Sequence, residues 1–209
     1  MEINITSAAF EGGGAIAPRY TCDGLNISPP LSWDSVPNGT RSLALIVDDP
    51  DAPGGSFVHW TIYDLPPDTR RLPEDVPKRR TLSSGAKQGI NGAGGIGYTG
   101  PYPPSGTHRY FFKIYAPDTT LDLGGGATAK RLSDAMEGHV LAEGQLMGTR
   151  RGRRSASHKD YPCRMSPQGT EHVLCPRSWI TRSVQRPPVR VYLPRETLCS
   201  TVRMRGKWR

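Results

Sequence analysis

Glycine and proline punctuate this chain so often that only short elements fit between the turns. The 209 residues include 24 glycines and 20 prolines. Short apolar runs bounded by these residues are typical of β-strands joined by tight turns. Residues 43–47 (Leu-Ala-Leu-Ile-Val) form a continuous apolar run, as expected of a strand covered on both faces. The sequence therefore predicts a mainly β fold of two sheets with a few peripheral helices.

Two further runs alternate along the chain, which places successive side chains on opposite faces of a strand. In residues 57–63, His59 is expected to share a face with Thr61 and Tyr63. Residues 108–115 predict a second such strand, with one face made of His108, Tyr110, Phe112 and Ile114. His108 and Tyr110 can then point into the same cavity. Residues 127–147 have apolar side chains near helical spacing and predict one helix.

Charge divides the chain into two parts, a domain at 1–149 and an Arg-rich tail at 150–209. The first part has 12 Lys and Arg against 16 Asp and Glu, and the second has 15 against 3, which together give the net charge of +8. The tail lacks apolar periodicity and is predicted to be disordered, or to be non-native sequence from a read-through or a shifted frame. If native, a basic tail could bind nucleic acid or an anionic membrane.

Cysteine usage predicts a cytoplasmic protein. Only Cys22 lies in the first part, so that part can form no internal disulfide, which suits a reducing compartment. The N-terminal residues lack the basic and apolar regions of a secretory signal, and no apolar run is long enough for a membrane span.

An acidic segment next to proline carries the first candidate site residues. Asp49 and Asp51 each stand close to a proline, at Pro50 and Pro53, and proline stiffens the exit from the preceding strand. A stiff exit can hold a carboxylate in a pocket, although aspartates beside Pro and Gly often only cap turns. A carboxylate beside His59 or His108 is expected to raise the pKa of the imidazole and favour its cationic, anion-binding form.

Five short motifs in this order resemble the phosphatidylethanolamine-binding protein family, specifically its bacterial, Raf-kinase-inhibitor-like branch. They are Thr21–Gly24, Ser28–Trp33, Asp48–Pro53, Val58–Trp60 and Gly106–Tyr110. The resemblance spans roughly residues 3–147 and implies the two-sheet β fold and a pocket for phosphate or a phosphorylated head group. It assigns the pocket to Asp49, His59, Pro104, His108 and Tyr110, with Asp51 supporting the loop.

Two classes of function remain open at this point. The first is a binding module for a phosphate-type anion, with a phosphorylated small molecule, a phospholipid head group or a phosphoprotein as partner and a possible regulatory role. The second is a small hydrolase in which His59 and His108 act as acid and base around Asp49, or hold a metal with it. No serine or cysteine nucleophile is recognisable, and no catalytic residue, metal or cofactor is assigned. The resemblance also suggests a homodimer.

Overall fold

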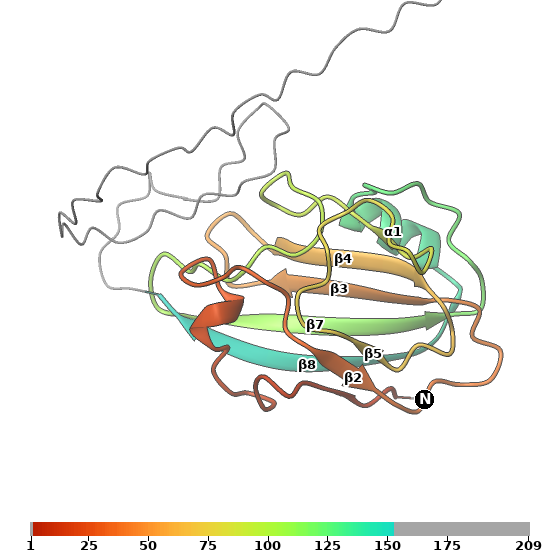
Figure 1. The fold of residues 1–209 in the computed structure, drawn as a ribbon, viewed down its shortest axis with the longest axis horizontal. Coiled ribbons are helices and arrows are strands. Elements are labelled where there is room, and N and C mark those ends of the chain that lie inside the picture. The colour runs from red at the N-terminus through yellow and green to blue at the C-terminus, as the bar shows by residue number, and fades with distance from the viewer. Residues whose placement is uncertain (1, 153–209) are drawn as a thin grey trace, which may run out of the picture. The chain divides into compact units, whose positions relative to one another are not determined.

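The computed structural model describes residues 2–152, and the fold within them is mainly β. The order of elements is β1 (Ile5–Thr6), the 3-10 helix η1 (Pro18–Tyr20), β2 (Leu31–Trp33), β3 (Leu43–Asp49), β4 (Phe57–Leu65), β5 (Arg71–Leu72), β6 (Lys87–Gln88), β7 (Thr107–Pro117), α1 (Ala129–Met136) and β8 (Val140–Arg151). Two antiparallel sheets result, one ordered β6-β4-β3-β7-β8 and the other β1-β2-β5. Figure 1 shows β4, β3, β7 and β8 side by side, with β2 and β5 in front of them.

The central strand β3 is buried on both faces, as its continuous apolar run predicts. Leu43, Leu45 and Val47 belong to the main core between the two sheets. Ala44 and Ile46 face a second, smaller cluster that packs beneath α1. In β7 the predicted alternation is confirmed, because His108, Tyr110, Phe112 and Ile114 are buried and the residues between them are more exposed.

The predicted helix over 127–147 is wrong in its second half. Helix α1 begins after Thr128, whose side chain accepts a hydrogen bond from the Arg131 amide, and it ends at Met136. Gly138 has a φ of 78°, a left-handed conformation that reverses the chain. Residues from Val140 onward form β8, which pairs with β7 along its whole length.

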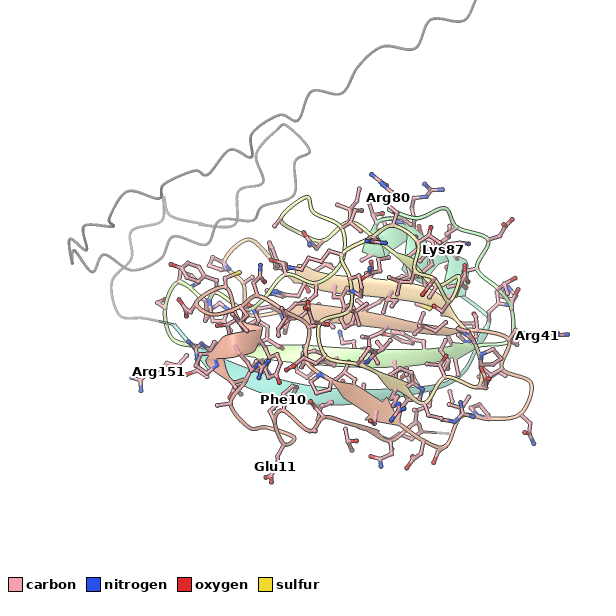
Figure 2. All side chains as sticks on the ribbon, in the orientation of Figure 1. Phe10, Glu11, Arg41, Arg80, Lys87 and Arg151 are labelled. Atoms are coloured by element: carbon pink, nitrogen blue, oxygen red, sulfur yellow. The ribbon has the colours of Figure 1, made fainter. Side chains whose placement is uncertain are left out.

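Strand β8 continues to Arg151, two residues past the expected domain boundary at 149. Arg151 pairs with Thr107 and Arg150 pairs with His108 across the two strands. The Arg150 guanidinium also donates to the Asp23 carboxylate at 2.9 Å. Figure 2 shows Arg151 pointing outward at one end of the sheet and Arg41 pointing outward at the other. The expectations for the tail from residue 153 onward lie outside the described residues.

The N-terminal segment lies along the free edge of β8. The Ile3 amide donates to the Glu143 carbonyl at 2.8 Å, and Ile16 and Thr149 are linked in the same way at 2.8 Å. A Cβ on Gly144 would overlap the Ile3 carbonyl, so this close approach requires glycine. The last long strand of the domain is therefore covered by its first residues, which protects an edge that could otherwise pair with another chain.

Candidate functional site

A cavity opens where β3 ends and where β4 and β7 begin. Its volume is about 280 Å³. The strands contribute Asp49, Phe57, His59 and His108, and the rest of the wall comes from loops. The loop residues are Cys22, Ala52, Pro53, Gly92, Ala93, Thr99, Gly100, Tyr102 and Pro104. Four of the five residues assigned to the pocket from the sequence, Asp49, His59, Pro104 and His108, thus line one cavity.

Asp49 and His108 form a buried pair in the wall of this cavity. The His108 Nδ1 lies 2.7 Å from the Asp49 Oδ2, and the two side chains are 9% and 5% exposed. The other Asp49 oxygen accepts the Asp51 amide at 2.8 Å, so the stiff loop after β3 fixes the carboxylate. Because the carboxylate occupies Nδ1 of His108, Nε2 is the ring nitrogen left for a ligand.

Asp51 supports the loop through Arg109 and does not line the cavity. Its carboxylate accepts the Arg109 Nη2 at 2.7 Å and both the Arg109 backbone amide and Nε at 2.9 Å. These hydrogen bonds hold the pKa of Asp51 well below its usual range. The bidentate pair ties the 50–56 loop to β7, one residue after His108.

His59 lies at a β-bulge, which corrects the face predicted for it. The β3–β4 register moves from Val47 opposite Trp60 to Asp48 opposite Val58, so His59 is the extra residue. Its ring packs edge-on against Tyr110 with centroids 5.1 Å apart, whereas Tyr63 belongs to the cluster beneath α1. A bulge re-aims a side chain in this manner, and here it brings His59 to the side of His108.

The environment of His59 also reverses the charge expected for it. Its Nδ1 lies 2.8 Å from the Thr99 carbonyl, and the ring packs between Phe57, at a tilt, and Tyr110, edge-on. Burial lowers the pKa of His59 to about 4, and the nearby Asp49 and Asp48 charges only partly oppose this. Desolvation therefore outweighs the carboxylates, and His59 is neutral at pH 7.

Tyr110 lies behind the cavity wall instead of lining it. Its side chain is in the main core, and its hydroxyl is buried without a hydrogen-bond partner among the described residues. Burial first, and the Asp49 charge second, raise the pKa of Tyr110 far above its usual value. Tyr110 is therefore the one residue of the five assigned to the pocket that the cavity lining lacks.

One wall of the cavity was missed by the sequence predictions. The Gly100 amide donates to the Asn26 side-chain oxygen at 2.6 Å, and the Cys22 amide donates to the Pro101 carbonyl at 3.1 Å. A Cβ on Gly100 would lie 2.7 Å from the Thr21 backbone, so glycine is required for this approach. The motif Thr21–Gly24 was a family signal only, and its contact with the 98–101 segment is not readable from local pattern.

The described residues contain no group of three or more His, Cys, Asp or Glu placed to hold a metal ion. Over the same part of the chain, no helix is long and apolar enough to cross a membrane.

Comparisons with known proteins agree with this architecture. Residues 6–151 match the family profile described as phosphatidylethanolamine-binding protein. A UPF0098 protein of Methanothermobacter thermautotrophicus is 56% identical over 151 residues, which cover 72% of this chain and 100% of the relative. A UPF0098 protein of Aquifex aeolicus is 48% identical over 149 residues, covering 70% of this chain and 86% of the relative.

Two solved structures share the fold. A phosphatidylethanolamine-binding protein homologue from Chlamydia trachomatis superposes with a TM-score of 0.67 at 42% identity, covering 73% of this chain and 99% of its own. The E. coli protein YbcL, described as a new member of the mammalian family, has a TM-score of 0.68 at 32% identity, covering 73% of this chain and 100% of its own. The profile match over residues 6–151 and these relatives lead to one conclusion: the chain belongs to the phosphatidylethanolamine-binding protein family.

Proposed function

We propose that this protein binds the phosphoryl group of a small phosphorylated ligand in the cavity between β3, β4 and β7. The observation that carries the proposal is the buried His108–Asp49 pair in the cavity wall. A carboxylate at Nδ1 fixes the orientation of an imidazole, and in the doubly protonated ring Nε2 donates to an oxyanion. Such a charge-assisted hydrogen bond is about twice as strong as a neutral one.

The remaining walls suit an organic group attached to the phosphoryl group. Ala52, Pro53, Phe57, Ala93 and Pro104 give the cavity a largely apolar lining. Its volume of about 280 Å³ lies just below the range typical of drug-sized ligands, so a head group fits better than a larger molecule. A phosphorylated metabolite, a phospholipid head group and a phosphorylated side chain share this chemistry.

Calorimetry with phosphorylethanolamine and inorganic phosphate tests the proposal. His108→Ala and Asp49→Ala should each weaken binding by about tenfold or more, since a hydrogen bond to a charged group contributes roughly 1.5–3 kcal/mol. His139→Ala is the matched control, because His139 Nδ1 and Asp118 Oδ1 also lie 2.8 Å apart but at the surface. Equal affinity in the wild type and both pocket variants would place the ligand elsewhere.

Three probes in the same assay distinguish three sources of the phosphoryl group. Free phosphorylethanolamine, a phosphoserine peptide and vesicles containing phosphatidylethanolamine represent a metabolite, a protein partner and a lipid. Preference for the peptide would support a regulatory role in the cytoplasm, the location that the cysteine usage predicts. Release of phosphate from a phosphomonoester, abolished in His108→Ala, would instead favour the hydrolase.

A further inference from the structure

The two histidines in the cavity have different hydrogen-bond partners, and this difference distinguishes ligands by their protonation. His108 Nδ1 is held by the Asp49 carboxylate at 2.7 Å, and His59 Nδ1 by the Thr99 carbonyl at 2.8 Å. A carboxylate stabilises an imidazolium far more than a neutral carbonyl does. The cavity wall therefore presents two Nε2 atoms of unlike character.

The backbone of Thr99 contacts both the backbone and the ring of His59. The Thr99 amide donates to the His59 carbonyl at 2.9 Å, while the Thr99 carbonyl accepts from the His59 ring. A carbonyl oxygen only accepts, so Nδ1 must carry the proton in either charge state. In the neutral ring, Nε2 then has a lone pair and no proton.

Burial keeps the His59 ring neutral across the physiological range. The residue is 5% exposed, and Asp49, the carboxylate with the larger influence on it, already bonds His108 and the Asp51 amide. The titratable groups that surround it or share the cavity wall are Asp48 and Asp49 from β3, His108 and Tyr110 from β7, Cys22 from the N-terminal loop and Tyr102 from the 100–106 loop. Burial is the largest influence and lowers the pKa of His59 to about 4.

We infer that the cavity selects the singly protonated form of a phosphoryl group, with His59 Nε2 accepting the P–OH proton and His108 Nε2 donating to a P–O⁻ oxygen. This inference rests on the proposed function and adds the protonation state of the ligand. A lone pair facing a fully ionised oxygen gains no hydrogen bond, and a buried polar atom left without one is costly. A phosphomonoester carries one acidic proton below its second pKa of about 6. Sulfate monoesters and phosphodiesters carry none.

Three ligands of equal charge test the inference on the full chain by calorimetry at pH 5.5. Ethyl phosphate, ethyl sulfate and dimethyl phosphate are all mainly monoanions at that pH, and only ethyl phosphate has a hydroxyl group. Ethyl phosphate should bind about tenfold tighter than ethyl sulfate, or more, by the usual worth of one charge-assisted hydrogen bond. From pH 7 to pH 8 the ratio of the two affinities should fall by about tenfold, because ethyl phosphate loses its proton. Protonation of groups on the protein changes the affinity for both ligands alike, so its effect cancels in the ratio of the two affinities.

His59→Gln adds a second readout. Its terminal amide can donate as well as accept, so ethyl sulfate gains a partner and the ratio should fall to within about threefold. His139→Gln, at the exposed pair with Asp118, should leave the ratio unchanged. Equal wild-type affinities for ethyl phosphate and ethyl sulfate at pH 5.5, or a ratio that does not change with pH, would overturn the inference and leave phosphoryl binding standing. Failure of all three ligands to bind would overturn the proposed function as well.

Discussion

The neutral state of His59 predicts how the stability of the protein depends on pH. In the unfolded chain the imidazole titrates near 6.5, whereas in the folded protein its pKa is about 4. Between these values the unfolded state binds more protons, so the free energy of unfolding rises with pH. The contribution is fully present above about pH 6.5 and is lost as the pH falls toward 4. At 1.36 kcal/mol per pH unit, the loss is about 3 kcal/mol.

The assay is urea unfolding of the wild type and His59→Asn from pH 4 to pH 8. The Asn side chain can still donate to the Thr99 carbonyl, but it does not titrate, and all other titrating groups are shared. The difference between the two free energies should be constant above pH 7 and should shift by about 3 kcal/mol against the wild type by pH 4. In melting temperature this is about 6–12 °C. Parallel curves down to pH 4 would refute the neutral ring and, with it, the acceptor at Nε2.

Two further predictions concern the end of β8 and the loop that holds Asp51. Residues 1–152 alone should keep the melting temperature and phosphate affinity of the full chain. Residues 1–149 should melt several degrees lower, because they lack the two residues at the end of β8 that pair with β7. Equal melting temperatures for the two truncated proteins would mean that the end of β8 is dispensable. Arg109→Ala should raise the pKa of Asp51 part of the way toward 3.8, because it removes the guanidinium, the largest influence that lowers this pKa, and keeps the backbone amide. An NMR titration of the carboxylates that shows no change for Asp51 would contradict this assignment.

Local pattern was enough to predict the strands that carry the site. The apolar run at 43–47 and the alternation at 108–115 reflect burial on both faces and on one face, and the structure confirms both. The prediction of one helix over residues 127–147 was wrong because apolar residues at helical spacing also fit a short helix followed by a strand. Gly138 separates the two, but a glycine in a helical pattern does not reveal its φ in advance.

The chemistry of the site was less predictable than its residues. Asp49, His59 and His108 were assigned from family motifs, yet the charge of His59 depends on burial and on a bulge that no period-2 pattern contains. The walls around Thr99 and Gly100 depend on contacts with Cys22 and Asn26, more than 70 positions away in the chain. Such contacts are set by the assembled fold.

Because the N-terminal segment pairs with β8, the two partners of each of these backbone hydrogen bonds are synthesised at very different times. Ile3 and Ile16 leave the ribosome well before their partners Glu143 and Thr149, which follow only when the domain is nearly complete. Contacts so distant in sequence slow folding, into the range of milliseconds to seconds for β-rich domains. Until β8 is synthesised, the N-terminal segment and the edge of β7 stay exposed, and exposed strands promote aggregation. The step that closes this sheet edge is therefore also the last step of folding during synthesis.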